Sequence, residues 1–163
     1  MSVTDFSGLL RLLSGAGVQY ILIGGVAATS HGSARATFDL DIVYRRSPDN
    51  LVRLVNALAP IKPYLRGAPP GLPFRWDVET LQAGLNFTLV TSLGDLDILG
   101  EVVGGGTYEE LFPHTEPLKI FSTECLRVDL DTLIRLKRAA GRPRDLDAIA
   151  ELEALREEKE GAN

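Results

Sequence analysis

Two aspartates lie in an apolar segment, where ionised carboxylates are unusual. Residues 38–44 read FDLDIVY, and in an extended strand Asp39 and Asp41 would share one face. The other face would carry Phe38, Leu40 and Ile42. Because burying a carboxylate costs free energy unless its charge is compensated, we expect a cation beside the two aspartates. Clustered carboxylate oxygens suit a hard divalent cation, so the expected ion is Mg²⁺, with Mn²⁺ as the alternative.

A pair of glycines precedes the aspartates, where an expected strand becomes a short helix. Gly24 and Gly25 have no Cβ, so the backbone there can approach a ligand closely. The first N–H groups of a helix have no intrahelical partner, and together with the helix dipole they favour a phosphate group. In the segment that follows, Arg35 can pair with a phosphate, and Thr37 can form a hydrogen bond near the metal ion.

A third carboxylate is available in the segment GDLDILG, residues 94–100. Asp97 lies in the middle of an expected strand, whereas Asp95 lies nearer the turn. If the sheet places this strand beside the first pair, three carboxylates converge. Two would hold a metal ion, and the third, which we assign to Asp97, could also accept the proton of an attacking hydroxyl group. A separation of more than about 8 Å would exclude shared coordination.

Each of these residues also has a purely structural interpretation. The glycines could form a tight turn, and the aspartates could lie on a solvated strand face. Lys137 and three nearby arginines could face the nucleotide or form a solvated basic helix face; the arginines are Arg138, Arg142 and Arg144. His31 ends the short helix, where a positive charge is favourable, so we expect a structural role for it.

Taken together, the glycine pair and the aspartates resemble the nucleotidyltransferase superfamily of the polymerase-β type. That family has Gly-Gly or Gly-Ser, followed after about a dozen residues by Asp-x-Asp, with a third acidic residue on a later strand. The matching residues here are Gly24, Gly25, Asp39, Asp41 and Asp97. The segments IGGVAATSHGSARATFDLDI and LIRLKRAAGRPRDLDAIAEL are similar to those of a bacterial branch of this superfamily. That branch contains abortive-infection toxins and small nucleotidyltransferase-like proteins. This resemblance covers roughly residues 18–155.

The resemblance implies a reaction and a set of roles. An acceptor hydroxyl attacks the α-phosphorus of a nucleoside triphosphate and releases pyrophosphate, and Mg²⁺ ions stabilise the attacking and leaving oxygens. The catalytic and metal-binding residues would be Asp39, Asp41 and Asp97. The nucleotide-binding residues would be Gly24, Gly25, Arg35, Thr37 and Lys137. The acceptor could be a tRNA end, a protein side chain or a small molecule, and the analogy also implies a partner protein of a toxin–antitoxin pair or a role in phage defence.

One departure from the family and two rival functions stay open. Familiar members carry a serine after the first glycine, and its hydroxyl helps to hold phosphate, whereas Gly25 offers only its backbone. The first rival is a catalytically inactive module of the same fold that binds a nucleotide or a partner protein. The second is a phosphohydrolase that uses the same carboxylates.

The composition limits the alternatives further. Of the 163 residues, 45% are hydrophobic and 24% are charged, which is typical of a globular domain, and the net charge of −5 does not favour a polyanion across the whole surface. One cysteine, Cys125, excludes a multi-cysteine metal site, and only two histidines argue against a histidine-rich one. The N-terminal residues do not resemble a signal peptide and no apolar run could span a bilayer, so a cytoplasmic location without membrane contact is expected.

These residues must be positioned by an alternation of helices and strands. The pattern predicts a helix, a strand at VQYILIGG, a short helix, the strand FDLDIVY and a helix from Ser47 to Pro60. A long proline-rich loop should follow, then a short helix, a hairpin around SLGD, a glycine run entering a helix, and a hairpin over residues 118–128. Two helices over about residues 129–160 end the chain. We therefore expect an α/β or α+β fold with a small mixed sheet flanked by helices, as a single nucleotidyltransferase-like domain over residues 1–163.

Overall fold

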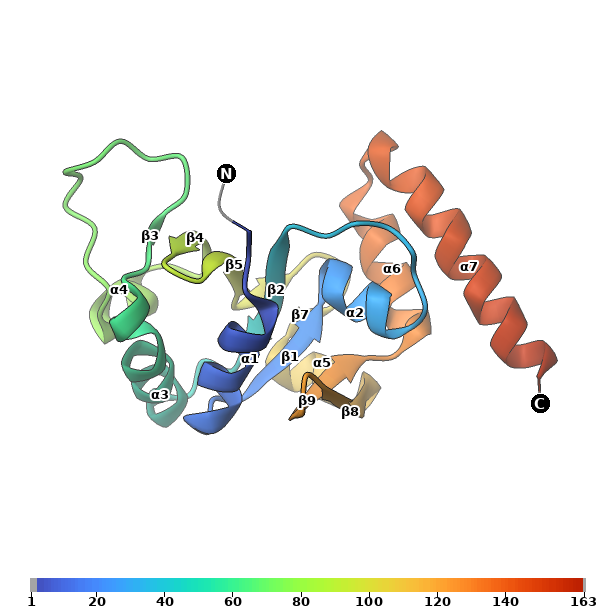
Figure 1. Cartoon of the computed structure of the whole chain (residues 1–163), viewed down its shortest axis with the longest axis horizontal. Coiled ribbons are helices and arrows are strands. Elements are labelled where there is room, and N and C mark those ends of the chain that lie inside the picture. Colours follow the sequence, from blue (N-terminus) through green and yellow to red (C-terminus); the bar gives the residue numbers. More distant parts are fainter. Residues whose placement is uncertain (1–2, 163) are drawn as a thin grey trace.

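The computed structural model describes residues 3–162 and shows one large sheet with helices around it (Figure 1). The elements before the first hairpin are α1 (Phe6–Gly15), β1 (Tyr20–Ile23), α2 (Gly24–Ser30), β2 (Asp39–Tyr44), α3 (Pro48–Leu58), β3 (Tyr64–Leu65) and α4 (Val78–Ala83). They are followed by β4 (Asn86–Thr91), β5 (Gly94–Leu99), β6 (Glu101–Val102), β7 (Gly106–Thr107), α5 (Tyr108–Leu111), β8 (Thr115–Ile120), β9 (Thr123–Val128), α6 (Leu130–Ala140) and α7 (Leu146–Gly161).

The large sheet is mixed and has seven strands in the order β3-β4-β5-β2-β1-β9-β8. Its two parallel pairs are β2 with β5 and β1 with β9, and the other neighbours are antiparallel. The two expected hairpins are present as β4–β5 and β8–β9. The mixed sheet flanked by helices is therefore confirmed.

The core beneath the acidic strand combines helices α1 and α3 with strands β2 and β5. The carboxylate of Asp5 caps α1 by accepting a hydrogen bond from the Gly8 N–H at 2.9 Å, and α3 begins with Pro48 in its first turn. Helices α1 and α3 pack against each other. Their leucines join the alternating apolar residues of β2 and β5 in one core; the fully buried members include Leu9, Leu10, Leu13, Leu40, Ile42, Leu54, Leu58, Leu96 and Ile98. The apolar face of β2 therefore lies in the core, and its acidic face is left for a site.

The side chain of Thr4 connects the beginnings of β2 and β5. Its Oγ1 donates a hydrogen bond to the carbonyl of Phe38 at 2.6 Å and accepts one from the N–H of Asp95 at 3.0 Å. The buried threonine therefore extends the pairing of the two strands by one side-chain bridge.

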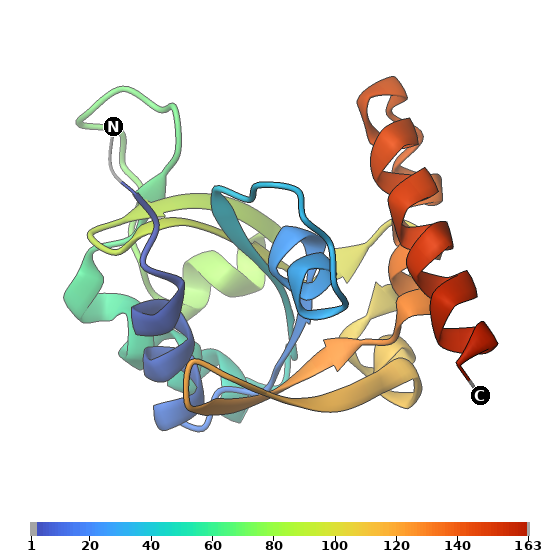
Figure 2. The same cartoon turned by 45° about the vertical axis from the view of Figure 1, so that its right-hand side comes forward.

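Helices α6 and α7 lie side by side at one end of the sheet (Figure 2). Helix α6 starts at the Asp129 cap, whose carboxylate accepts the Thr132 N–H, and ends where Gly141 adopts a left-handed conformation with φ of 64°. From α7, Glu151 accepts hydrogen bonds from the Ser33 hydroxyl and the Ala34 N–H. The C-terminal helix thus holds the loop that precedes β2.

His31 also contacts α7. Its Nε2 lies 2.9 Å from the Val128 carbonyl, and its Nδ1 lies 3.1 Å from Lys159 Nζ. Burial lowers the pKa of His31, and the nearby Arg127 and Lys159 lower it further, although the bond to Val128 opposes this. The lowered pKa favours the neutral imidazole. His31 connects α2 to β9 and α7, so its expected structural role is confirmed, whereas the expected positive charge at the helix end is wrong.

Three further local predictions need correction. Phe38 does not lie on the apolar face of β2, because the strand begins at Asp39 and Phe38 precedes it with 77% of its surface exposed. The proline-rich segment is not entirely a loop, because β3 pairs with β4 at the edge of the sheet. The glycine run 104–106 connects a second small sheet, β6–β7, before α5.

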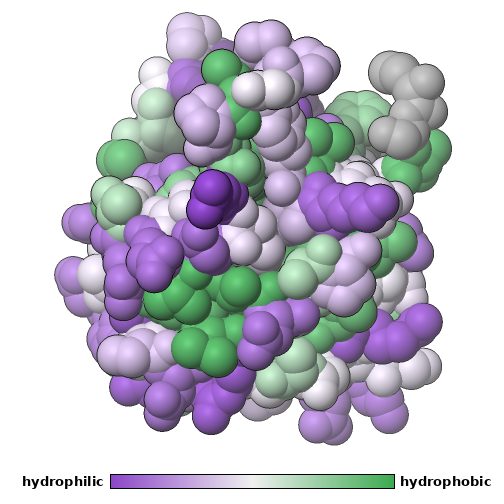
Figure 3. Space-filling view, turned by 90° about the vertical axis from the view of Figure 1, so that its left-hand side faces the viewer, coloured by the Kyte–Doolittle hydropathy of each residue, from purple (hydrophilic) through white to green (hydrophobic). Residues whose placement is uncertain are grey.

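The side of the molecule that carries α3, α4 and the loop after β3 shows apolar side chains gathered among polar ones (Figure 3). The large exposed apolar residues of these segments are Val52 and Leu72, and Leu85 lies between α4 and β4. Within residues 3–162, no helix is both long enough and apolar enough to cross a bilayer.

Candidate active site

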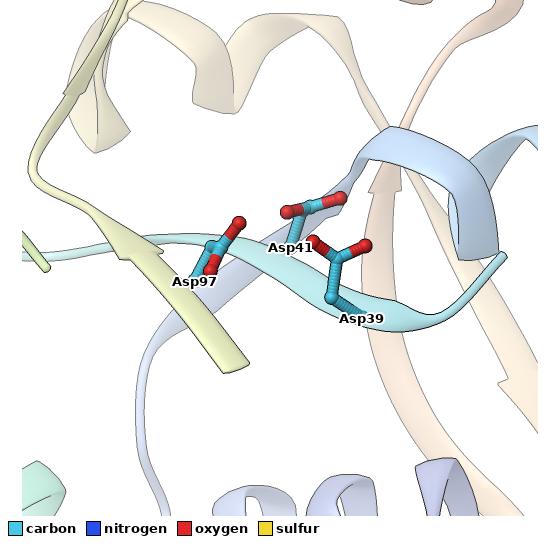
Figure 4. Close-up of side chains that lie close together, drawn as sticks. All are labelled: Asp39, Asp41 and Asp97. Atoms are coloured by element: carbon cyan, nitrogen blue, oxygen red, sulfur yellow. The ribbon is translucent and has the colours of Figure 1, made fainter. Parts of the chain in front are cut away.

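The parallel pairing of β2 with β5 brings three expected carboxylates together. In the register, Asp41 lies opposite Asp97 and Asp39 lies opposite Asp95. The side chains of Asp39, Asp41 and Asp97 point toward one another from the two strands (Figure 4). One carboxylate oxygen from each lies within 4.8 Å of the others. The separation is well below the limit of about 8 Å for shared coordination.

The oxygen donors fit a small divalent cation. Mg²⁺ binds carboxylate oxygens at about 2.1 Å, so small side-chain adjustments would let all three aspartates reach one ion. Aspartate, without histidine or cysteine, is the donor set that hard cations prefer. Asp95 lies on the same face of β5 but is not a member of the close group.

Gly24 stands beside Asp41 and permits this arrangement. Ile23, the last residue of β1, lies opposite Asp41 in the sheet, and Gly24 starts α2 with a φ of +69°. A Cβ on Gly24 would collide with the Asp41 carboxylate. Position 24 therefore requires glycine for two reasons: its left-handed backbone conformation and the space that Asp41 occupies.

A second reason for glycine at position 25 is its contact with Thr37, which was not expected from the sequence. A Cβ at this position would not project into open space for a ligand, because it would collide with the Oγ1 and Cβ of Thr37. The Thr37 hydroxyl therefore lies where the side chain of a serine at position 25 would begin. In this chain, the hydroxyl group beside the start of α2 is supplied by Thr37.

Arg66 belongs to this site, although its sequence context gave no indication of it. It follows β3, and its guanidinium extends to the carboxylates of β2 and β5. Its Nη2 donates hydrogen bonds to Asp97 Oδ1 at 2.8 Å and to the carbonyl of Leu89 at 2.7 Å. Its Nη1 lies 3.8 Å from Asp39 Oδ2, and its Nε lies 3.4 Å from Asp95 Oδ1. A cation from the chain itself therefore compensates part of the acidic cluster.

The cluster opens into a cavity of about 760 Å³, a volume typical of small-molecule sites. One wall is formed by the start of α2 and by the loop before β2, which includes Arg35 and Thr37. The other wall comes from α6 and the segment that leads into α7, with the lining residues Leu133, Leu136, Lys137, Arg142 and Arg144. All eight residues assigned to metal or nucleotide binding from the sequence line this cavity.

Asp145 positions two of the cations on this wall. Its buried carboxylate accepts a hydrogen bond from Arg142 Nε at 2.6 Å and lies 3.6 Å from Lys137 Nζ. Burial opposes ionisation, but Arg142 and Lys137 together hold the pKa of Asp145 below its ordinary value. Arg138 points elsewhere, because it pairs with Glu153 on α7. The basic residues of α6 are therefore divided between the cavity and the helix surface.

Burial and mutual repulsion raise the pKa values of two of the carboxyl groups. Burial, followed by the charges of Asp39 and Asp97, raises the pKa of Asp41 to about 8. The pKa of Asp39 is also raised, first by burial and then by Asp97, while Arg66 acts in the opposite direction. Without a divalent cation, the carboxyl group of Asp41 is therefore largely protonated at neutral pH, and its titration depends on the charge of Asp39.

This arrangement predicts a pH-dependent stability in EDTA. Because the pKa of Asp41 is raised from 3.8 to about 8, the folded protein binds more protons than the unfolded chain between these values. The free energy of unfolding should therefore fall as the pH rises through this window and level off above it. Asp41→Asn should remove most of the fall, which urea denaturation at several pH values would measure.

The matched control is Asp77→Asn. The pKa of this exposed carboxyl is lowered, not raised, mainly by its hydrogen bonds with Thr80, so the substitution should leave the fall in place. An unchanged fall in Asp41→Asn would show that the acidic cluster does not control the pH dependence.

Comparisons with solved structures show which fold carries this site. The chain is similar to the lincosamide antibiotic adenylyltransferase LnuA, crystallised with lincomycin, at a TM-score of 0.60 and 15% identity over 95% of this chain and 99% of that chain. It is also similar to a presumed nucleotidyltransferase from Thermotoga maritima, at a TM-score of 0.50 and 11% identity over 94% of this chain and 89% of that chain. No family model and no curated protein matches the chain. These matches show that the chain has the nucleotidyltransferase fold, as expected from its sequence.

Proposed function

We propose that the protein is a Mg²⁺-dependent nucleotidyltransferase that moves a nucleoside monophosphate from a nucleoside triphosphate to an acceptor hydroxyl, with residues 1–163 acting as one domain. The observation that carries this proposal is the convergence of Asp39, Asp41 and Asp97 within 4.8 Å, in a cavity with a basic opposite wall. Carboxylates alone would suit many cation sites. Carboxylates that face arginine and lysine across a cavity suit a metal-bound polyphosphate.

Each side of the cavity has a part in this function. Asp39, Asp41 and Asp97 hold Mg²⁺, or Mn²⁺ in its place, and the bound ion supplies positive charge to the phosphate oxygens as they become more negative. The N–H groups at Gly24 and Gly25 and the hydroxyl of Thr37 bind phosphate oxygens on the β1–α2 side. Arg35 and Lys137 neutralise the rest of the triphosphate from the loop and from α6.

The transfer itself needs few groups from the protein. The acceptor oxygen forms a bond to the α-phosphorus, and the bond from that phosphorus to the β-phosphate oxygen breaks, which releases pyrophosphate. Asp97 accepts the proton of the attacking hydroxyl. The remaining residues hold the reacting atoms in line.

Three classes of acceptor fit the proposed reaction. A small hydroxylated molecule is supported by the likeness to an enzyme named for lincosamide antibiotics, and the net charge of −5 gives no broad attraction for tRNA. A tRNA end and a protein side chain are the other two acceptors, and either would suit a toxin or phage-defence component with a partner protein. The alternative function is a catalytically inactive module of the same fold that binds a nucleotide or a partner protein.

Calorimetric titration tests the proposal without knowledge of the acceptor. ATP, GTP, CTP and UTP are titrated in turn with Mg²⁺ or with EDTA. At least one triphosphate should bind, and binding should require the ion because the carboxylates repel an uncomplexed triphosphate. Asp39→Asn with Asp41→Asn should abolish the binding. Equal binding in EDTA, or binding that survives the double substitution, would place the nucleotide elsewhere.

Asp97→Asn separates an enzyme from an inactive module. Metal-nucleotide binding should survive because Asp39 and Asp41 remain, whereas transfer of a labelled α-phosphate to a pool of tRNA, protein and small hydroxylated acceptors should fall. Loss of a general base costs about 10²–10⁴-fold, and loss of metal coordination adds to this. Asp95→Asn is the matched control on the same strand face and should lose far less activity. If wild type itself transfers nothing, the inactive module is favoured.

A swap of the hydroxyl between two positions tests the contact of Gly25 with Thr37. Thr37→Ala should weaken triphosphate binding by about tenfold, because a hydrogen bond to a charged group is lost. Gly25→Ser alone should also weaken it, since the new Cβ meets Thr37. Combining Gly25→Ser with Thr37→Gly, which removes both atoms that the new Cβ would meet, should restore the affinity that Thr37→Gly alone loses, and additive losses in the calorimeter would rule out this use of the hydroxyl.

A further inference from the structure

Arg66 holds the position that a cation needs at Asp97. Its Nη2 is bonded to Asp97 Oδ1, and the same guanidinium lies within 4.0 Å of Asp39 and Asp95. Asp39 and Asp97 are two of the three residues of the proposed metal site. A guanidinium and a divalent ion carry charge of the same sign, so both cannot use these oxygens fully at the same time.

The guanidinium of Arg66 is well hydrogen-bonded at Nη2 but not at Nε. Its Nη2 has two good acceptors, Asp97 and the carbonyl of Leu89. Its Nε is buried and finds no hydrogen-bond partner within residues 3–162, although the Asp95 carboxylate lies 3.4 Å away. An unpaired buried N–H of a charged group is costly, so the bound arrangement depends on the negative charge around it.

Arg66 lies at the edge of the sheet, with its side chain partly exposed and a glycine-containing loop after it. Arg66 is the first residue after the two-residue edge strand β3, and its N–H donates to the carbonyl of Thr88. The next residue is Gly67, with a φ of +79°, and Gly71 follows in the same loop with a φ of +89°. Its side chain is 27% exposed, so it can turn toward solvent while the backbone bond to β4 stays in place.

We propose that Arg66 is a resident counter-ion that occupies Asp97 in the nucleotide-free protein and competes with the divalent cation for it. This deepens the proposed function, on which it rests, by assigning a control of cation entry to the same site. Arg66 compensates the carboxylates of β2 and β5 when no metal is bound. A divalent cation binds fully only after the guanidinium has given up Asp97, so Arg66 weakens the binding of a free cation.

Titration with Mn²⁺ alone, followed by electron paramagnetic resonance of the free ion, measures this competition without nucleotide or acceptor. Arg66→Gln should tighten Mn²⁺ binding by about tenfold or more, because glutamine keeps a donor for the Leu89 carbonyl but carries no charge. The control is Arg75→Gln, which removes the same charge from an exposed position in the same loop and should leave the affinity near that of wild type. Unchanged or weaker Mn²⁺ binding in Arg66→Gln would overturn the proposal.

A second variant separates occupancy from net charge and protects against misfolding. Arg66→Gln combined with Asp95→Asn removes one charge of each sign, so the cluster keeps its net charge and should fold as wild type does. If Arg66 competes by occupying Asp97, the double variant also binds Mn²⁺ more tightly than wild type. If only net charge matters, it binds like wild type, and the proposal is wrong.

Two further results keep this test apart from the test of function. Adding Asp39→Asn and Asp41→Asn to Arg66→Gln should abolish the tight Mn²⁺ binding, and its survival would mean that the ion binds elsewhere and that Arg66 does not control it. Tighter binding in Arg66→Gln, together with a wild-type protein that transfers no nucleotide, would support the competition while rejecting the transferase.

Discussion

The parallel pairing of β2 with β5 is the constraint on which the site depends. It places Asp41 opposite Asp97 and Asp39 opposite Asp95, so four carboxylates lie on one face of two adjacent strands. A shift of the register by one residue would turn one strand's aspartates toward the core and its leucine and isoleucine toward the cavity. The apolar faces of both strands, which include Leu40 and Leu96, therefore fix the geometry of the acidic face from behind.

Concentrating these charges has consequences for the surrounding residues. Gly24 has to be a glycine because Asp41 occupies the space of its side chain. Arg66 has to cross from the edge of the sheet because β2 and β5 themselves supply no basic residue to this face. Asp41, which Arg66 does not contact, has a pKa raised to about 8. The structure therefore accommodates the acidic cluster in three ways. Gly24 leaves space for the Asp41 carboxylate, Arg66 supplies a positive charge, and the raised pKa of Asp41 favours its neutral form.

Patterns that act over a few residues could be predicted from the sequence. The alternation in FDLDIVY separates the acidic face of β2 from its apolar face, and the SLGD turn places the β4–β5 hairpin. The choice of Asp97 over Asp95 followed from its place in the middle of the strand, and the structure puts Asp97 in the close group.

Contacts between distant segments could not be predicted in this way. Arg66 reads as a loop arginine, because only the β3–β4 pairing brings it across to the cluster. The contact of Thr37 with Gly25 depends similarly on how the loop before β2 folds back over α2.

Both ends of the described chain help to hold the site. Thr4 ties the start of β2 to the start of β5, and Glu151 on the last helix fixes the backbone at Ser33 and Ala34, just before Arg35. Truncation at either end of the described chain would therefore affect the site. Deleting the first few residues would loosen the acidic strands, and deleting the last helix would release the loop that carries Arg35 and Thr37, even if the sheet itself survived. Affinity tags belong beyond these anchors, and minimal versions of this domain have to keep both.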